Sequence, residues 1–170
     1  LTGETGCGKS TQVPQFLYES NLFGAVPKES SSDGPRGLIA VTQPRRIPTM
    51  MLAARVSEEM GTTVGYNRKE SQEHGLHHEG GIVGCHVPYR KLIDPKHCRI
   101  TFLTDEVLVR ETRYDPLLSR YNVIMVDEAH ERSLYTDILL GILRNIQGRR
   151  PSLWVIVSSA TMDTVFFKSF

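Results

Sequence analysis

Short apolar runs alternate with amphipathic segments along most of the chain. The strand-like runs lie at residues 38–41, 100–103, 123–126 and 153–157. Helical spacing of apolar residues is found at residues 9–20, 50–60, 105–111, 132–147 and 163–170. Short apolar strands of this kind suit a sheet that is covered on both faces. The pattern therefore predicts an α/β domain with a mostly parallel, doubly wound sheet and with its sites at the carboxyl ends of the strands.

Two polar stretches interrupt this alternation. Residues 27–35 contain three serines and no large apolar residue, which is typical of a surface loop. Residues 66–81 are rich in charged residues and histidines and end in two glycines, which is typical of an insertion. Neither stretch is expected to contribute to the core of the domain.

Composition limits the classes of protein to which the chain can belong. With 170 residues and 39% hydrophobic content, residues 1–170 are expected to form one domain. The formal net charge is +1, so contact with a polyanion has to come from local clusters of charge. Three irregularly spaced cysteines argue against a disulfide framework and favour an intracellular protein. No apolar run is long enough to span a membrane, and no signal peptide is recognisable.

The first motif that indicates chemistry is Gly-Glu-Thr-Gly-Cys-Gly-Lys-Ser at residues 3–10. Its glycines allow backbone N–H groups to turn inward around a phosphate, as at the start of a helix that binds nucleotides. Lys9 is expected to reach the terminal phosphates of ATP, and Ser10 is expected to ligate Mg²⁺. An ordinary glycine-rich turn without a ligand is the alternative.

Both ends of the chain have the features of a piece of a larger domain. A phosphate loop normally follows a buried strand, and only two residues precede this one. At the other end, residues 166–170 form an apolar run with no signal that stops a helix. We therefore expect that the domain is truncated at both ends.

Two consecutive carboxylates form the second motif, directly after the apolar run 123–126. Asp127 is expected to hold Mg²⁺, directly or through water, and Glu128 to orient and deprotonate the attacking water. A solvated strand end that caps the next helix is the alternative. The phosphate loop upstream favours the nucleotide site.

Several motifs, in this order, resemble those of the DEAH-box RNA helicases. Motifs I, Ia, II and III are matched by GETGCGKSTQ at 3–12, TQPRR at 42–46, DEAHER at 127–132 and SAT at 159–161. Thr104 and Asp105 resemble motif Ib. The resemblance implies a RecA-like phosphate-loop NTPase domain, the first of two such lobes. It also implies an ATP-dependent RNA helicase that hydrolyses ATP with Mg²⁺, translocates on RNA and unwinds it, in pre-mRNA splicing or in ribosome biogenesis.

The resemblance also assigns roles to individual residues. The nucleotide would be bound by Gly3, Glu4, Thr5, Gly6, Cys7, Gly8, Lys9, Ser10, Thr11 and Arg55. The catalytic residues would be Lys9, Glu128 and His130, and the metal would be held by Ser10, Asp127 and Glu128. RNA would contact Arg45, Arg46, Thr104 and Asp105. Coupling of hydrolysis to movement of the lobes would involve Ser159, Ala160 and Thr161.

The arginines have simpler alternatives. Arg45 and Arg46 follow a strand and a proline, which presents two guanidinium groups to phosphates, but an exposed surface pair has the same sequence. Arg55 resembles the family arginine that stacks on adenine from this lobe. The alternative is that Arg55 pairs with Glu58 or Glu59 at helical spacing.

The threonine and serine motifs have a structural alternative as well. Thr104 has the position of an N-cap for the helix that follows it, and residues 159–161 precede the helix expected at 163–170. An RNA-binding or coupling role is compatible with such a capping role.

The sequence departs from the family pattern at two places. Glu106 replaces a usual glycine and puts a carboxylate where the RNA backbone would pass, which would weaken the contact if the charge faces a phosphate and would have a small effect if the side chain turns into solvent. The family strand Val-Gly-Tyr has two candidates here, at 64–66 and 83–85. The second is favoured, and residues 64–81 are then an insertion that is atypical of the family; otherwise the insertion lies at 72–98.

A zinc site is suggested by the number of possible ligands in this region. They are His74, His77, His78, Cys85, His86, His97 and Cys98. Their spacing lacks the paired Cys-x-x-Cys or His pattern of a zinc site. We therefore expect a solvated loop and no zinc.

Other functions remain as alternatives. An ATP-gated RNA-binding switch with little hydrolysis is disfavoured by intact Lys9, Asp127 and Glu128. Another DExH nucleic-acid translocase shares the same motifs, whereas a transporter or unfoldase is disfavoured by motifs Ia and III. The expected partners are single-stranded RNA, the second RecA-like lobe and a protein activator, with no membrane. The second lobe would supply the arginine fingers, so the 170 residues alone should hydrolyse ATP poorly. The nucleus is the expected location, and the cytoplasm is the alternative.

Overall fold

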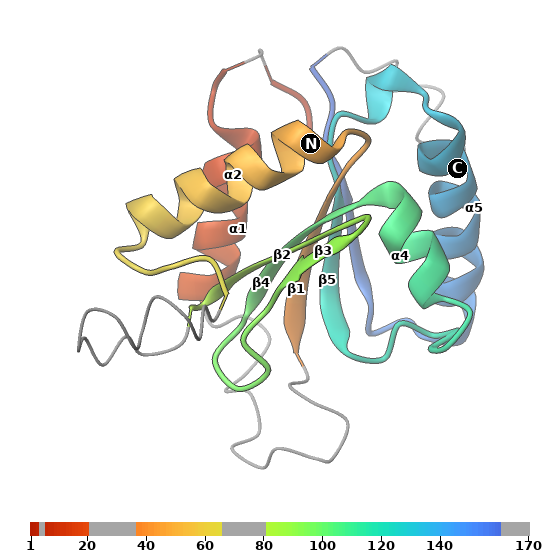
Figure 1. Ribbon diagram of the computed structural model, residues 1–170. Helices are drawn as coiled ribbons and strands as arrows, with labels where there is room; N and C mark the ends of the chain where they lie inside the picture. The colour runs from red at the N-terminus through yellow and green to blue at the C-terminus, as the bar shows by residue number, and fades with distance from the viewer. Residues whose placement is uncertain (4–5, 21–36, 66–80, 161–170) are drawn as a thin grey trace.

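A six-stranded sheet forms the centre of the computed structural model, which describes residues 1–3, 6–20, 37–65 and 81–160 (Figure 1). The strands are β1 (Leu38–Gln43), β2 (Val83–Val87), β3 (Arg90–Leu92), β4 (Ile100–Thr104), β5 (Tyr121–Val126) and β6 (Trp154–Val157). Their order across the sheet is β3-β2-β4-β1-β5-β6. All the pairings between these strands are parallel except that of β2 with β3.

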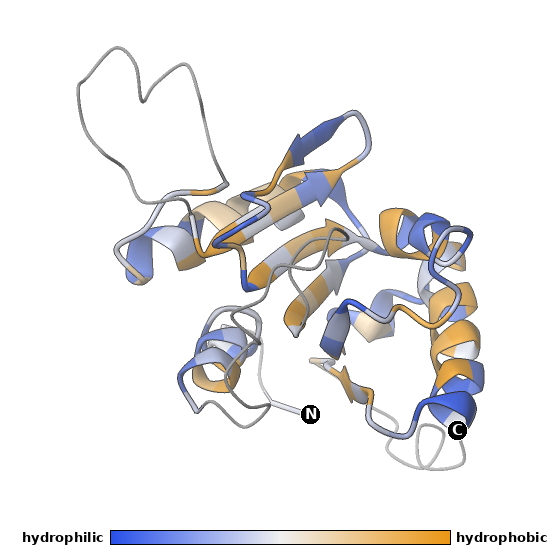
Figure 2. Cartoon of the chain, turned by 90° about the horizontal axis from the view of Figure 1, so that it is seen from below, coloured by the Kyte–Doolittle hydropathy of each residue, from blue (hydrophilic) through white to orange (hydrophobic). Residues whose placement is uncertain are grey.

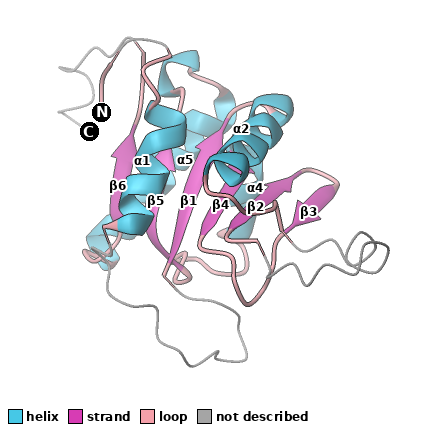
Figure 3. Cartoon of the chain, turned by 90° about the vertical axis from the view of Figure 1, so that its left-hand side faces the viewer, coloured by secondary structure: helices cyan, strands magenta, loops and turns pink. Residues whose placement is uncertain are grey.

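Helices cover both faces of the sheet. One face carries α1 (Lys9–Glu19) and α2 (Arg46–Glu59), and the other carries α4 (Asp105–Glu111) and α5 (Leu134–Arg149). Figure 3 shows the first pair in front of the sheet and the second pair behind it. The expected α/β fold, with a mostly parallel sheet between helices, is confirmed.

Alternation along the central strand β1 divides the core into two halves. Ile39 and Val41 pack with α2 and with Phe102 of β4 on one face. Leu38 and Ala40 pack on the other face, with the apolar residues of α4 and α5. Figure 2 shows the hydrophobic colour along the strands and on α5. Burial on both faces explains why the whole of β1, six residues, is buried.

The expected elements have nearly the observed bounds. The helix expected at 105–111 has the bounds of α4. Helix α2 begins four residues earlier than expected, at Arg46, and includes Pro48. A proline is tolerated there because the N–H groups of the first turn have no partner within a helix.

Helix α5 begins two residues later than expected. Ala129–Glu131 form a short 3-10 helix, η1, and Arg132 then has a left-handed backbone with φ 50°. The side chain of Ser133 accepts a hydrogen bond from the backbone N–H of Thr136 and caps α5. The true start of the helix is therefore set by this serine.

The second of the two candidate strands is the core strand, as expected. Val83–Val87 form β2, which pairs in parallel with β4. Val64 of the first candidate makes a single parallel bridge to Val83. Gly65 follows with φ 64°, and a Cβ there would lie 2.6 Å from the backbone carbon of Leu92. The atypical insertion at 64–81 stays a prediction, since most of it lies outside the described residues.

Two further expectations fall outside the part that is described. They are the loop at 27–35 and the helix at 163–170. Among the helices that the structure describes, none has both the length and the apolar character needed to cross a membrane.

Candidate active site

Polar side chains gather at the carboxyl ends of the parallel strands, although this end of the sheet is buried. Gln43 ends β1, Thr104 ends β4, and Asp127 and Ser158 directly follow β5 and β6. The exposed fraction of each of these residues is 3% or less. Carboxyl ends of neighbouring parallel strands meet at one edge, so the fold brings these groups together. This edge is where a doubly wound sheet is expected to hold a ligand.

The glycine loop turns into the first helix at the same end of the sheet. Gly6 and Gly8 have φ of 84° and 85°, in the left-handed region that glycine adopts without strain. Gly8 precedes the first residue of α1, and its carbonyl accepts hydrogen bonds from the N–H groups of Thr11 and Gln12 at 3.2 and 2.7 Å. The first turn of α1 contains no acidic residue, so its N–H groups and the helix dipole favour an anion.

Lys9 lies folded over this loop. Its Nζ donates a hydrogen bond to the carbonyl oxygen of Gly3 at 2.6 Å and lies 3.5 Å from Sγ of Cys7. A Cβ at Gly3 would lie 3.1 Å from that sulfur and 3.6 Å from Cδ of Lys9, so a larger residue would require the Cys7 side chain to shift. The ammonium group is therefore held within the loop, where a phosphate would sit. Glu4 and Thr5 lie outside the described residues.

Ser10 and Thr11 occupy the first turn of α1. Thr11 Oγ1 donates a hydrogen bond to the carbonyl oxygen of Gly8 at 3.3 Å, which ties the helix to the loop. Both hydroxyls therefore lie at the helix start, as the nucleotide-site prediction requires.

The start of the chain is paired with β6. The backbone nitrogen of Leu1 donates to the carbonyl oxygen of Val157 at 2.7 Å, and the N–H of Ser159 donates to the carbonyl oxygen of Leu1 at 3.2 Å. Thr2 also bridges Ser159 in parallel. Ser159, expected to couple hydrolysis to movement, thus lies next to the base of the glycine loop, followed by Ala160. Thr161 lies outside the described residues.

Asp127 is a buried acid at this edge, with 1% of the residue exposed. Its Oδ2 accepts a hydrogen bond from Nε2 of Gln43 at 2.5 Å. Its other oxygen, Oδ1, has no hydrogen-bond partner among the described residues. A buried carboxylate oxygen without a partner is costly, and coordination of Mg²⁺ or of a metal-bound water would satisfy it. The donor set of Asp127 and the Ser10 hydroxyl is all oxygen, which fits Mg²⁺.

Glu128 has an unusual backbone and a perturbed side chain. Its φ is 54°, a left-handed conformation that is uncommon for a residue other than glycine and that often marks a functional site. Burial, and next the charge of Asp127, raise the pKa of Glu128, whereas the charges of His130 and Lys9 lower it. Nε2 of His130 lies 3.4 Å from the Glu128 carboxylate. The residues before the glycine loop pair with Val157 and Ser159, and the N–H of Ala129 donates to the carbonyl oxygen of Ser158 at 3.0 Å, so the loop and the Asp-Glu pair lie at the same end of the sheet.

The arginine pair lies between the end of β1 and the start of α2. Arg45 and Arg46 are exposed, as an RNA contact requires. Nε of Arg45 lies 3.0 Å from Oε2 of Glu131, which belongs to η1 directly after the Asp-Glu pair. Arg45 is therefore paired with an acid of motif II, an interaction that the sequence alone did not reveal.

Thr104 and Asp105 are buried, with 3% and 1% exposed. Thr104 does occupy the N-cap position of α4, but its side chain makes no capping hydrogen bond. Oγ1 of Thr136 in α5 donates to Oδ2 of Asp105 at 2.5 Å, and burial raises the pKa of Asp105. The Asp105 side chain therefore braces α4 against α5, and neither Thr104 nor Asp105 exposes its side chain to a passing RNA. Their RNA-binding role stays a prediction.

Glu106, the departure from the family pattern, turns toward its own helix. Its Oε1 lies 3.7 Å from NH2 of Arg110, one helical turn later. This arginine partly offsets the charge of the carboxylate, which would reduce the repulsion of a phosphate at this position.

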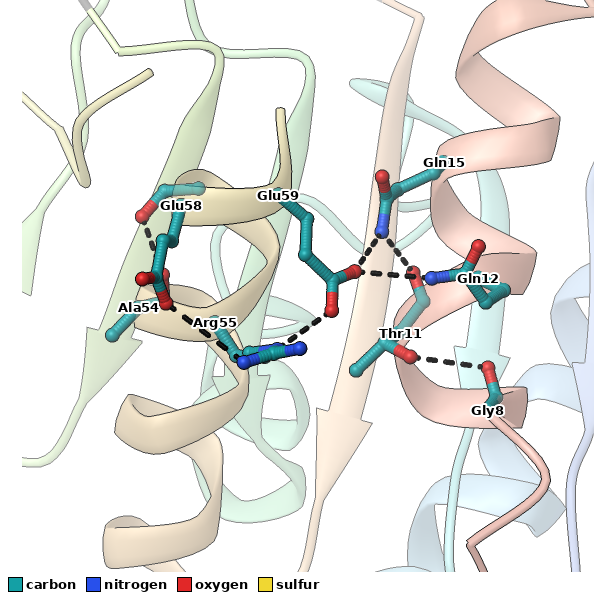
Figure 4. Close-up of polar contacts among 9 residues, drawn as sticks. Gly8, Thr11, Gln12, Gln15, Ala54, Arg55, Glu58 and Glu59 are labelled. Atoms are coloured by element: carbon teal, nitrogen blue, oxygen red, sulfur yellow. Dashed lines mark hydrogen bonds and ion pairs between the residues drawn. The ribbon is translucent and has the colours of Figure 1, made fainter. Parts of the chain in front are cut away.

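Arg55 has the ion pairs that were the alternative to a nucleotide contact. Its Nε lies 2.6 Å from Oε1 of Glu59, and its NH1 lies 4.0 Å from Oε2 of Glu58 (Figure 4). The guanidinium remains largely exposed. From the sequence, Glu59 was only one of two possible ion-pair partners of Arg55. The signal for this pair was the spacing of four residues, which places both side chains on the same face of a helix.

The histidines and cysteines that are described do not form a metal site. No cluster of three or more possible ligands occurs among the residues that the structure describes. His97 pairs with Asp94 and His86 with Glu111. Burial raises the pKa of Cys85 to about 11, which disfavours the thiolate that zinc requires. His74, His77 and His78 lie outside the described residues.

Similarity to known proteins extends over the whole chain, although no known protein-family model matches it. A human protein named probable ATP-dependent RNA helicase DHX35 is 45% identical over 170 residues, and a Caenorhabditis elegans homolog of that name is 46% identical over the same length. A mouse protein named ATP-dependent RNA helicase DHX33 is 41% identical over 175 residues. The matches cover 100% of this chain but 20 to 21% of each relative, so the chain spans about a fifth of the length of these relatives. Motif order and sequence identity together relate this chain, over its whole length, to one segment of the DEAH-box ATP-dependent RNA helicases.

Proposed function

We propose that this chain is the ATP-binding first lobe of an RNA helicase, and that the whole protein hydrolyses ATP to translocate on RNA and unwind it. One observation carries the proposal: the Lys9 loop and the Asp127–Glu128 pair lie at one edge of the sheet, where Asp127 is buried and its Oδ1 has no hydrogen-bond partner among the described residues. A phosphate loop and two carboxylates in this arrangement are the parts of a phosphoryl-transfer site.

Each group has a separate task in nucleotide binding. The N–H groups of the loop and of the first turn of α1 hold the phosphates, and Lys9 leaves its bond to Gly3 to contact the terminal ones. Ser10 and Asp127, with Glu128 nearby, would hold Mg²⁺, directly or through water. The metal ion would supply neutralisation of the charge on the phosphates.

Glu128 is the proposed general base for the attacking water. Its raised pKa makes it a stronger base than an ordinary glutamate. His130, 3.4 Å from the carboxylate, orients it. The left-handed backbone at Glu128 turns its side chain out of the strand direction at the point where β5 ends.

RNA would pass the carboxyl ends of β1 and β4. Exposed Arg45 and Arg46 would bind its phosphates, and the backbone at Thr104 and Asp105 would add contacts. Ser159, Ala160 and Thr161 would couple hydrolysis to movement, since Ser159 contacts the segment that leads into the glycine loop. A second lobe would supply arginine fingers, and a protein activator would regulate the cycle.

The setting is also part of the proposal. The free thiols of Cys7, Cys85 and Cys98 suit a reducing compartment, and the nucleus is the proposed location. RNA remodelling in splicing or ribosome biogenesis is the proposed role, as the helicase names of the relatives are consistent with RNA as the substrate.

Turnover of ATP by the full-length protein tests this proposal. We expect turnover to require Mg²⁺ and to rise when single-stranded RNA is added. Tight ATP binding with negligible RNA-stimulated turnover would instead indicate an ATP-gated switch. Stimulation by single-stranded DNA of the same sequence, but not by RNA, would indicate a different DExH translocase.

A further inference from the structure

A polar network joins α1 and α2 through the carboxylate of Glu59. Oε1 of Glu59 accepts a hydrogen bond from Nε of Arg55 at 2.6 Å. Oε2 accepts two more, from Nε2 of Gln12 at 3.0 Å and from Nε2 of Gln15 at 2.7 Å. Figure 4 shows Glu59 between Arg55 of its own helix and the two glutamines of the facing helix.

The position of Glu59 within its helix does not explain this network. It is the last residue of α2, where the helix dipole disfavours a negative charge. The carboxylate is nevertheless only 23% exposed and has three side-chain donors. Its neighbour Glu58 is 78% exposed and lies 4.0 Å from Arg55. Glu59 is therefore held by hydrogen bonds from other side chains, whereas Glu58 is largely solvated.

The network continues to the glycine loop. Gln12 lies over Gly8, since a Cβ on that glycine would lie 3.1 Å from Cγ of Gln12. Gln15 is buried, and its Nε2 also donates to the carbonyl oxygen of Thr11 at 3.0 Å. A series of direct contacts therefore runs from Arg55 through Glu59 and Gln12 to the loop that holds the phosphates.

The ion pair between Glu59 and Arg55 leaves the faces of the guanidinium free. It uses Nε, at the edge of the planar group, and the Arg55 side chain remains 63% exposed. A planar cation that is fixed by its edge still offers its face to an aromatic ring. The ion pair and a stacked base are therefore compatible. The ion pair fixes the plane of the guanidinium, and a stacked base would lie parallel to that plane.

We propose that Glu59 is a positioning residue, which sets the Arg55 guanidinium at a fixed place relative to the glycine loop for stacking on the base of the nucleotide. This inference rests on the proposed ATP-binding function and on the contact of Arg55 with the adenine that the family resemblance implies. Glu59 acts through Arg55 and does not itself touch the nucleotide. It makes recognition of the base depend on the helix that binds the phosphates.

The test compares a ligand that has a base with one that lacks it. The dissociation constants of Mg-ADP and of Mg-tripolyphosphate are measured for the full-length protein and for Glu59→Ala, Arg55→Ala and the double variant. We expect each single variant to weaken ADP binding about fivefold and to leave tripolyphosphate within about twofold. The double variant should bind ADP as weakly as Arg55→Ala, because Glu59 acts only through Arg55.

Glu58→Gln is the matched control, since it removes the adjacent, solvated acid of the same helix; its ADP affinity should not change. Thermal melting checks that each variant is folded. If Glu59→Ala does not fold, Glu59→Gln replaces it. The amide keeps the shape of the side chain, but it has no negative charge and only one acceptor oxygen for the three donors.

Three results would overturn the inference. Equal loss of ADP and tripolyphosphate affinity in Glu59→Ala would mean that Glu59 only braces the two helices. Unchanged ADP affinity in Glu59→Ala, with a loss in Arg55→Ala, would leave the base contact standing and remove the role of Glu59. Unchanged ADP affinity in Arg55→Ala would remove the base contact itself, whereas a wild-type protein that binds neither ligand would contradict the proposed function.

Discussion

Arg45 and Glu131 form an ion pair, with 3.0 Å between Nε and Oε2, although they lie 86 residues apart in the sequence. Arg45 is proposed to bind RNA, and Glu131 follows the Asp-Glu pair of the proposed nucleotide site. An RNA phosphate at Arg45 would have to compete with this carboxylate. The two sites therefore share a pair of charges.

Removal of the acid should strengthen RNA binding. For Glu131→Gln we expect the dissociation constant for single-stranded RNA to fall about threefold, because an exposed ion pair is worth about 1 kcal/mol at most. Fluorescence anisotropy with labelled RNA would measure it. Asp137→Asn is the control, since Asp137 pairs with exposed Arg132 at 2.8 Å. Unchanged or weaker RNA binding by Glu131→Gln would contradict a competition for Arg45.

Removal of both arginines should weaken RNA binding and change its dependence on salt. For the double variant Arg45→Ala, Arg46→Ala, the slope of log affinity against log salt should become shallower by about one unit for each phosphate that the protein no longer neutralises. Titrations at several salt concentrations would measure the slope. Arg113→Ala, an exposed arginine beyond the end of α4, should leave it unchanged. An unaltered slope in the double variant would indicate that Arg45 and Arg46 are solvated surface residues that do not bind RNA phosphates.

Loss of the proposed base should separate binding from hydrolysis. Glu128→Gln should keep its affinity for ATP and lose about 10²- to 10⁴-fold in turnover, the usual contribution of a general base. Nucleotide titration and steady-state ATPase assays would measure the two quantities. A variant with wild-type turnover would rule out Glu128 as the base.

The pH dependence of turnover should also reflect the raised pKa of Glu128. Burial and the Asp127 charge raise its pKa, so the base becomes protonated at a higher pH than an ordinary glutamate. We expect kcat to fall, as the pH is lowered, at a pH above the usual glutamate range. A pH profile of kcat for the full-length protein would locate this limb. A profile that stays flat down to pH values at which ordinary glutamates protonate would contradict the assignment.

Lowering the pH should destabilise the fold by protonating a different carboxylate, that of Glu111. Glu111 is held by Tyr121, whose OH donates to Oε2 at 2.7 Å, and by His86 at 3.3 Å from Oε1. Burial raises the pKa of Glu111, but these interactions outweigh it and leave that pKa below its usual value. The ionised form thus contributes stability above the unfolded-state pKa, and this contribution is lost as the pH falls through the folded-state pKa.

Urea unfolding of the wild type and of Glu111→Gln would measure this contribution. The difference in the free energy of unfolding should be largest near neutral pH and should shrink on acidification. Glu106→Gln, at a more exposed position of the same helix, should show a smaller difference. A difference that does not depend on pH would show that Glu111 stabilises the fold by packing alone.

Local pattern was enough to predict much of the fold. Helix α4 matched its expected bounds because apolar periodicity and an N-cap position coincide there. The start of α5 was wrong by two residues, because the left-handed backbone of Arg132 interrupts the chain before Ser133 caps the helix. No periodic signal encodes such a backbone state.

The position of the candidate site was predictable where residues adjacent in sequence form it. The glycine loop and the Asp-Glu pair are contiguous motifs, and their meeting follows from the order of the parallel strands. The bonds from Gln12 and Gln15 to Glu59 span 47 and 44 residues. The direction in which those side chains point depends on how α1 and α2 pack, which the sequence pattern does not specify. For the same reason, the burial of Asp105 against Thr136 was not foreseen.

The unpartnered oxygens at the strand ends have a practical consequence. Oγ1 of Thr104, Oδ1 of Asp127 and Oγ of Ser158 are buried without hydrogen bonds among the described residues. Each such atom is a cost to the empty protein that a bound ligand and its ordered waters would remove. Ligand-free protein should therefore be the form most easily lost during purification, and storage with Mg²⁺ and nucleotide should protect it from heat.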